Sequence, residues 1–299
     1  MKNQHFLRSL KSKGLIVLFL VFMNCISNTT LDIQGHRGCR GLLPENSLPA
    51  FETAIDLGVN TLELDIAITK DKKVVVSHEP FMSRTICYDP SGEEIPEEMD
   101  MAYNLFEMTY NDIKAFDCGT KFHPDYPNQK KSSVYKPLLS EVFELVKSKN
   151  AKVNFNIEIK SKPSYYGIYT PYPEEYVEIV LEEIRQNDMF NAVNLQSFDL
   201  NVLEEIKKQS PEMKVALLVD EGEDINEKLN KLSYKPEIIS PFFKLLTSKI
   251  VKNYHAEGYT IIPWTVNDVE DMEQVISFKV DGIITDYPNK LLKLTAKSY

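Results

Sequence analysis

The sequence has no apolar run long enough to cross a membrane. Its unbroken apolar run, Leu15 to Met23, has nine residues, less than half of the about 20 that a spanning helix needs. Basic residues without acidic ones precede this run, at Lys2, Arg8, Lys11 and Lys13. A basic segment followed by a short apolar run is typical of a secretory leader. We therefore expect residues 1–25 to be a leader and the protein to be exported to the periplasm or cell envelope.

Cysteine is scarce, with four residues in the chain. Cys25 directly follows the apolar run, where an acylated cysteine would tether a lipoprotein to a membrane, although Asn24 is larger than the residue usual at that position. Lipoprotein processing and simple cleavage both remain open. The other three cysteines form no Cys-x-x-Cys pair, and an odd number excludes complete pairing within one chain. Export permits a disulfide, for which Cys87 and Cys118 are the best candidates, but free or buried thiols, including Cys39, are equally expected.

Basic residues are outnumbered by acidic ones, with 34 Lys and Arg against 44 Asp and Glu. The formal net charge is −10, and it becomes about −14 without the four leader cations. Proteins that bind nucleic acid cluster Lys and Arg on one surface, so no nucleic-acid partner is expected. An anionic substrate must be held by a few local residues.

A glycine-rich phosphate loop after the first strand is also absent, which argues against a doubly wound sheet. From Leu31 onward, β-rich apolar runs alternate with segments of helical period, as in repeated βα units. The eight expected strands centre on Gln34, Leu62, Asn156, Leu195, Leu217, Ile238, Ile262 and Ile283. The expected helices include 47–57, 139–149, 174–187, 200–209, 225–232, 245–257 and 269–278. This α/β pattern predicts a single (β/α)8 TIM-type barrel over residues 31–299.

Residues 74–77 form a ninth β-like run that follows the second strand with no room for a helix, so we expect a hairpin. Residues 80–135 then lack barrel periodicity and contain five prolines among acidic and aromatic residues. We interpret them as a long insertion. Because barrel active sites are built on loops at the C-terminal ends of the strands, the insertion should overhang the active site.

Acidic side chains interrupt two apolar strands of the expected barrel. Glu63 and Asp65 lie two residues apart on one strand face, and Glu158 with Lys160 repeats the pattern on another strand. Unpaired buried charges are costly, so acids directed at a common barrel mouth need a partner. Oxygen-only ligands favour one hard divalent cation, Ca²⁺ or Mg²⁺. The alternative is an internal salt bridge from Glu63 or Glu158 to Lys160 or Arg37.

Two histidines stand at comparable strand ends, His36 in Gly35-His36-Arg37-Gly38 and His78 after residues 74–77. Cleavage of a phosphodiester needs one group that removes a proton and one that supplies a proton, and imidazole can do either near neutral pH. We therefore predict that His36 and His78 are the catalytic pair, with Arg37 binding phosphate oxygens. His123 and His255 are expected to be surface or packing residues.

A series of motifs follows in a characteristic order. They are Gly35-His36-Arg37-Gly38, Pro44-Glu45-Asn46-Ser47, Glu63-Leu64-Asp65, His78, Glu158-Ile159-Lys160, Gln196-Ser197-Phe198, Trp264-Thr265-Val266-Asn267 and Gly282-Ile283-Ile284-Thr285-Asp286-Tyr287-Pro288. Their order and spacing closely resemble the glycerophosphodiester phosphodiesterase family, over residues 33–289. One departure is His78-Glu79, where the family usually has His-Asp. The extra methylene changes the reach of that acid and leaves substrate details open.

The resemblance implies a fold and a set of roles. The fold would be the barrel of the phospholipase C-like phosphodiesterases, with His36 and His78 as the acid and base. The remaining implied site residues are Glu63, Asp65 and Glu158 for the metal, Arg37 and Lys160 for the phosphate, Glu45 as a brace, and Gln196 as a further substrate-binding residue.

Trp264 is the one tryptophan of the chain, and it ends the seventh expected strand. We interpret it as an apolar wall for the alcohol portion of the substrate, with a barrel-closing core aromatic as the alternative.

The expected activity is metal-dependent hydrolysis of a small glycerophosphodiester to sn-glycerol 3-phosphate and an alcohol. Two alternatives stay open. The first is another phosphodiesterase on the same barrel, either lyso-lipid phospholipase D-like or phosphoinositide-specific. The second is a noncatalytic exported protein that binds glycerophosphate compounds, although binding alone needs no acid and base pair.

Overall fold

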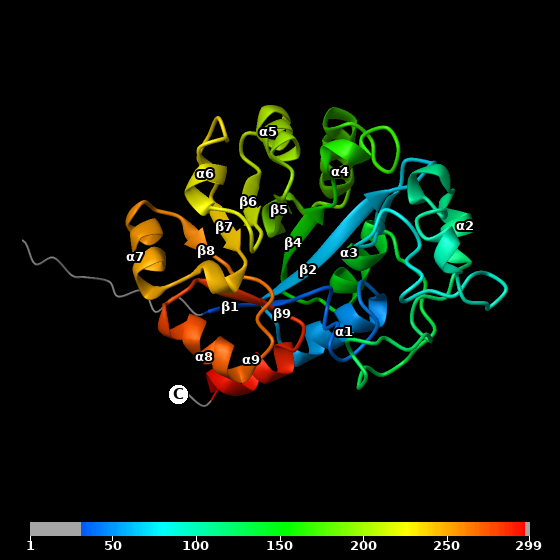
Figure 1. The fold of residues 1–299 in the computed structure, drawn as a ribbon, viewed down its shortest axis with the longest axis horizontal. Helices are drawn as coiled ribbons and strands as arrows, with labels where there is room; N and C mark the ends of the chain where they lie inside the picture. Colours follow the sequence, from blue (N-terminus) through cyan, green and yellow to red (C-terminus); the bar gives the residue numbers. More distant parts are fainter. Residues whose placement is uncertain (1–30, 297–299) are drawn as a thin grey trace, which may run out of the picture.

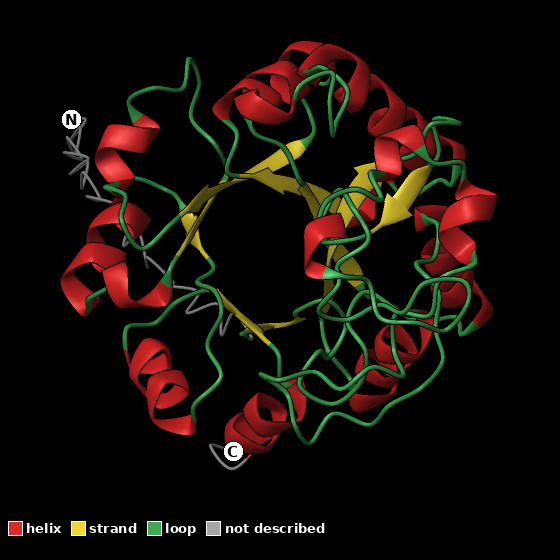
Figure 2. Ribbon diagram, turned by 45° about the vertical axis from the view of Figure 1, so that its right-hand side comes forward, coloured by secondary structure: helices red, strands yellow, loops and turns green. Residues whose placement is uncertain are grey.

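Eight parallel strands form a closed barrel in the computed structural model, which describes residues 31–296. The strands are β1 (Asp32–Gly35), β2 (Thr61–Ile68), β4 (Asn154–Ile159), β5 (Val193–Ser197), β6 (Lys214–Val219), β7 (Ile238–Pro241), β8 (Thr260–Ile261) and β9 (Gly282–Thr285). Their order is β8-β7-β6-β5-β4-β2-β1-β9. Backbone hydrogen bonds from Asp281 N to Ile261 O (2.9 Å) and from Ile284 N to Pro263 O (3.0 Å) join β9 to the end of β8. Figure 2 shows the resulting ring, which confirms the predicted TIM-type barrel.

The helices surround the barrel (Figures 1 and 2). They are α1 (Leu48–Leu57), α2 (Tyr110–Lys114), α3 (Leu139–Ser148), α4 (Pro173–Gln186), α5 (Leu200–Gln209), α6 (Ile225–Leu229), α7 (Ser248–Ala256), α8 (Val269–Ser277) and α9 (Pro288–Ala296). Within residues 31–296, none of them is long and apolar enough to cross a bilayer. The expected leader and Cys25 lie outside the described residues.

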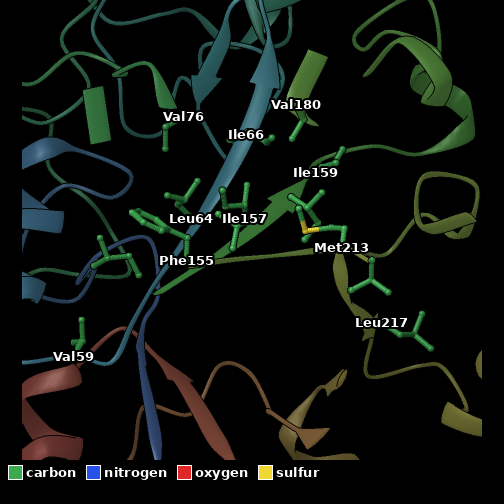
Figure 3. Close-up of a cluster of buried hydrophobic side chains, with 14 of the residues drawn as sticks. Val59, Leu64, Ile66, Val76, Phe155, Ile157, Ile159, Val180, Met213 and Leu217 are labelled. Atoms are coloured by element: carbon green, nitrogen blue, oxygen red, sulfur yellow. The ribbon is translucent and has the colours of Figure 1, made fainter. Parts of the chain in front are cut away.

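Alternation along β2 and β4 separates an outer apolar layer from a polar face inside the barrel. In β4, Phe155, Ile157 and Ile159 belong to the main core, together with buried residues of β2, α3 and α4. Figure 3 shows this cluster, with Leu64 and Ile66 of β2 beside β4. Since successive strand residues point to opposite faces, this packing turns the intervening polar residues of both strands into the barrel.

The barrel interior carries a chain of side-chain amides where aliphatic residues are usual. Asn156 Nδ2 donates to Gln34 Oε1 (2.9 Å) and to Gln196 Oε1 (3.1 Å). Gln196 Nε2 in turn donates to Glu63 Oε1 (3.0 Å). Because buried amides need partners, this chain fixes which end of the Gln196 amide faces the acidic residues above it.

The insertion begins after β3 (Val74–Val76), which pairs antiparallel with β2 and confirms the expected hairpin. The helix α2 and the short turns η1 (Glu97–Met99) and η2 (Leu105–Glu107) lie in the insertion, cyan to green in Figure 1. A second apolar cluster packs it on the hairpin, with Ala67 and Val75 among its buried members. A disulfide joins Cys87 to Cys118 inside this cluster, and Cys39 is buried and free. The insertion therefore has a small core of its own.

Candidate active site

Three buried carboxylates converge at the C-terminal end of β2 and β4. Glu63 and Asp65 come from β2 and Glu158 from β4, and the parallel register sets Asp65 beside Glu158. One oxygen from each lies within 4.8 Å of one from both others. This is the one group of three or more such ligands that the described part of the chain brings together. The structure therefore juxtaposes the residues that the sequence assigned to a metal.

Burial and the charges of neighbouring residues shift the pKa values of these acids. Burial raises the pKa of Glu158 to about 7, although Lys160 opposes the shift. Burial, followed by the charge of Asp65, raises the pKa of Glu63 well above its usual value. Burial acts in the same direction on Asp65, but Arg37 and the nearby His78 and Lys160 outweigh it and lower its pKa. The site therefore holds a proton near neutral pH unless a cation replaces it.

The residues present fit a divalent cation. Asp65 Oδ1 is buried and accepts no hydrogen bond. Asn46 Nδ2 donates to the other carboxylate oxygen, Oδ2, at 2.9 Å. Lys160 pairs with Glu158 at 2.7 Å and Arg37 with Glu45 at 2.8 Å. The internal salt bridge that was the alternative to a metal site is thus present at Glu158. Asp65 also has Arg37 Nε at 3.3 Å and Lys160 Nζ at 3.7 Å. Arg37 and Lys160 are then shared among four carboxylates, those of Glu45, Glu63, Asp65 and Glu158, so an oxygen-ligated Mg²⁺ or Ca²⁺ is the further partner with suitable chemistry.

Both predicted histidines lie at this cluster, and a carboxylate orients each. His36 Nδ1 is 2.6 Å from Asp286 Oδ1, and His78 Nδ1 is 2.8 Å from Glu79 Oε1. A carboxylate accepts hydrogen bonds, so each neutral ring carries its proton on Nδ1 and keeps Nε2 free to accept a proton. Burial lowers the pKa of His36 to about 4, against the opposing effect of Asp286. Burial, followed by Arg37, also lowers the pKa of His78.

A left-handed turn at the end of β1 positions Arg37. The backbone angle φ is 49° at Arg37 and 84° at Gly38. A Cβ on Gly38 would lie 2.8 Å from the backbone of Ala50, so α1 packs too close for a side chain there. The turn directs Arg37 N to Glu63 Oε2 (2.9 Å), while the guanidinium reaches Glu45. Glu45 therefore holds the Arg37 guanidinium in a buried ion pair.

Sequence reasoning gave no role to Asp286, which follows β9. Besides His36, it accepts hydrogen bonds from Arg40 Nε (2.9 Å), Tyr126 OH (2.8 Å) and Asn267 Nδ2 (2.7 Å). These donors come from three separate parts of the chain, including the insertion. The available signal was a polar residue directly after an apolar strand, since that position faces the barrel mouth.

A cavity of about 180 Å³ opens between the histidines and Trp264. Eight of the ten predicted site residues line it: His36, Arg37, Glu63, His78, Glu158, Lys160, Gln196 and Trp264. Asp65 lies buried behind this wall, and Glu45 faces a neighbouring cavity. Trp264 donates to Ser240 O (2.8 Å) and stacks edge-on with Phe198, so one wall of the cavity is aromatic.

Comparison with known proteins agrees with this geometry. Residues 36–290 match the model of the glycerophosphoryl diester phosphodiesterase family. A "Glycerophosphodiester phosphodiesterase" of Caldanaerobacter subterraneus subsp. tengcongensis is 33% identical over 267 residues, which cover 89% of this chain and 98% of that protein.

Solved structures show the same fold. A putative glycerophosphoryl diester phosphodiesterase from Silicibacter pomeroyi superimposes with a TM-score of 0.82 at 27% identity, covering 91% of this chain and 95% of that one. An Oleispira antarctica phosphodiesterase, solved with the product sn-glycerol-3-phosphate, has a TM-score of 0.70 at 21% identity, covering 89% and 96%.

Proposed function

Because the chain belongs to the glycerophosphoryl diester phosphodiesterase family, we propose that it hydrolyses small glycerophosphodiesters to sn-glycerol 3-phosphate and an alcohol. In this proposal His36 and His78 transfer the protons. The metal ligands are Glu63, Asp65 and Glu158, and Arg37 and Lys160 bind the phosphate. Gln196 lines the substrate cavity and also holds Glu63, and Trp264 forms the apolar wall.

One observation carries the proposal: two carboxylate-oriented imidazoles border the same cavity as Glu63 and Glu158 of the acidic triad. A protein that only binds glycerophosphate needs no such pair. The size of the cavity also favours a small substrate, because about 180 Å³ lies below the roughly 300–1,000 Å³ common for drug-sized ligands. A lyso-lipid would have to place its acyl chain outside this cavity.

The protein residues divide the work as follows. A divalent cation, when bound, neutralises charge on the phosphate and polarises its oxygens. The Arg37 guanidinium, fixed by Glu45, adds hydrogen bonds to the same phosphate. One imidazole Nε2 removes the proton from the attacking hydroxyl, and the other imidazole, protonated on Nε2, supplies a proton to the departing oxygen.

The attacking group that we propose is the neighbouring glycerol hydroxyl. It would form a cyclic phosphate, which water then opens. Detection of a transient cyclic glycerophosphate by ³¹P NMR would support this order of events, and its absence under single-turnover conditions would favour direct attack by water.

Turnover and metal removal test the main proposal. Glycerophosphodiesters should release glycerol 3-phosphate, which a coupled dehydrogenase assay detects, and EDTA should abolish the release until Mg²⁺ or Ca²⁺ is added. His36→Ala and His78→Ala should each lower kcat about 10²–10⁴-fold while the protein stays folded. Near-normal kcat in either variant would remove that histidine from the mechanism. Tight ligand binding by a wild-type protein that shows no turnover would instead favour a binding protein.

Export is a separate part of the proposal. The leader pattern supports it, and the Cys87–Cys118 disulfide is a bond typical of oxidising compartments. Acylation of Cys25 would tether the enzyme to a membrane. Metabolic labelling with palmitate, followed by cell fractionation, should label the wild type but not Cys25→Ala, and an unlabelled wild type in the soluble periplasmic fraction would indicate simple cleavage.

A further inference from the structure

A second cavity, of about 220 Å³, lies on the other side of His78. It shares Arg37, Arg40 and His78 with the first cavity, the one between the histidines and Trp264, but His36 does not line it. The imidazole of His78 therefore borders two spaces, whereas that of His36 borders one. A phosphodiester carries two alcohols on opposite sides of one phosphorus, so two cavities that meet at the phosphate-binding arginine match its shape.

The insertion builds the outer wall of this second cavity. Ser83, Thr85, Ile86, His123 and Asp125 line it, and all belong to residues 80–135. His123, expected to be a surface or packing residue, is buried and packs edge-on against Tyr126, and it also faces this space. The cavity is polar except for Ile86, in contrast to the aromatic wall at Trp264.

Lys136 lies at the base of the second cavity as a buried cation without an ion pair. Its exposed fraction is 5%, and its ammonium donates to Ser77 Oγ at 2.8 Å. Within residues 31–296 no carboxylate lies within 4.0 Å of that nitrogen, because Arg37 engages Glu45 and His78 engages Glu79. An ammonium can donate three hydrogen bonds, so two of its donors have no side-chain or backbone acceptor in the described structure.

The energetics also favour a ligand at Lys136. Burial, opposed by the more distant Glu45 and Glu79, lowers the pKa of Lys136, which means that the surrounding protein does not fully compensate the charge. Burying a charge without a partner is costly, and the single hydrogen bond to Ser77 leaves part of that cost uncompensated. An acceptor oxygen from a ligand would satisfy the free donors.

We propose that the second cavity holds the leaving alcohol of the glycerophosphodiester and that Lys136 selects alcohols with a carboxylate. This extends the proposed function and rests on it. The substrate class is a glycerophosphodiester whose alcohol is a hydroxy acid, such as glycerophosphoserine. The ammonium group of such a head group would lie nearer to the exposed Asp125 at the rim.

The position of His78 follows from this placement. The bond between phosphorus and the leaving oxygen breaks on the side of the second cavity, and His78 Nε2 supplies the proton to that oxygen. On the opposite side the attacking oxygen forms its bond to phosphorus, and His36 Nε2 takes its proton. His78 enters the step as the imidazolium and His36 as the neutral imidazole, and the two have exchanged these states when the cyclic product has formed. The proton on His36 and the neutral His78 are then available for the step in which water opens the cyclic product.

Glycerophosphoserine and glycerophosphoethanolamine provide a matched test, because they differ only in the carboxylate. The ratio of their kcat/KM values, measured on one preparation, does not depend on the fraction of folded enzyme. For the wild type we expect a ratio of about 10 or more, since a hydrogen bond to a charged group changes affinity by roughly 10- to 100-fold. Lys136→Met and Lys136→Gln should bring the ratio close to one.

Lys131→Met is the matched control, because Lys131 is exposed, lies close to Lys136 in the sequence and carries the same charge. It should keep the wild-type ratio and so separate the local contact from a change in net charge. A wild-type ratio near or below one would overturn the proposal, as would a preference that both Lys136 variants retain. If the wild type cleaves neither compound nor any other glycerophosphodiester, the proposed function fails; if it cleaves both without preference, only the head-group assignment fails.

Discussion

Asp286→Asn should disable His36 without removing it. The carboxylate accepts the His36 Nδ1 proton at 2.6 Å and an Arg40 Nε proton on the same oxygen, while its other oxygen accepts from Tyr126 and Asn267. An asparagine replaces one of these acceptors with an NH₂ donor. Whichever way the amide turns, donors face donors on one side.

The expected effect follows from the imidazole tautomer. If the NH₂ faces His36, Nδ1 becomes the acceptor and the ring proton moves to Nε2, where the ring can no longer remove a proton from the substrate. If the amide oxygen faces His36, Tyr126 and Asn267 lose their acceptor and the side chain no longer holds its position. Either outcome removes most of one proton-transfer contribution, which is about 10²–10⁴-fold in kcat, with a smaller change in KM because the phosphate-binding residues are untouched.

Steady-state kinetics with glycerophosphocholine measure this effect, and a thermal unfolding curve checks the fold. Tyr126→Phe is the control, because it removes one neutral donor and keeps the carboxylate. It should lower kcat by less than about tenfold. Asp286→Asn with a kcat within tenfold of the wild type would show that the carboxylate does not set the state of His36, and a larger fall in Tyr126→Phe would point to the position of the insertion instead.

Three further results are expected. Divalent cations should bind more weakly as the pH falls below about 7, by up to tenfold per pH unit, because the proton on Glu158, whose pKa is about 7, must leave before the metal binds. Calorimetry in buffers of different ionisation enthalpy should show this proton release, and equal metal affinity at pH 6 and pH 8 would contradict it. Cys87→Ser with Cys118→Ser should lower the free energy of unfolding by about 3–4 kcal/mol, since the bond closes a loop of 31 residues; urea titration measures it, and an unchanged midpoint would show that the insertion core suffices. Gly38→Ala should destabilise the protein and lower activity together, because its Cβ would meet Ala50 at 2.8 Å and φ is 84°; a variant as stable and active as the wild type would refute the requirement for glycine.

The barrel and the acidic triad were predictable from the sequence because both depend on local alternation. Where polar residues occupy every second position of an apolar strand, the alternation shows which side chains face into the barrel. Glu63 and Asp65 therefore shared a face whatever lay around them. Glu158 joined them because parallel strands end at one edge of the barrel.

Contacts between distant segments were not predictable in this way. Asp286 binds His36 across 250 positions of the chain, and Lys136 binds Ser77 across 59. Asp286 meets His36 because β1 and β9 pair where the barrel closes, a pairing that local alternation does not give. Lys136 meets Ser77 through the path of residues 80–135, which depends on a small tertiary core and a disulfide. The sequence allowed that disulfide but left free thiols equally expected, since it does not give the distance between the cysteines.

The positions of these residues separate the chemistry from head-group recognition. The acids, His36 and Gln196 come from barrel strands or their ends, where hydrogen bonds from neighbouring strands restrict movement. The outer wall of the second cavity comes from the insertion, whose apolar core is distinct from that of the barrel. Substitutions at Ser83, Thr85 or Ile86 should therefore change the ratio of the kcat/KM values for substrates with different head groups. The ratio of kcat measured with added metal to kcat measured without it should stay as in the wild type. If they instead altered metal binding, the insertion would be part of the metal site, and the division into two cavities would be wrong.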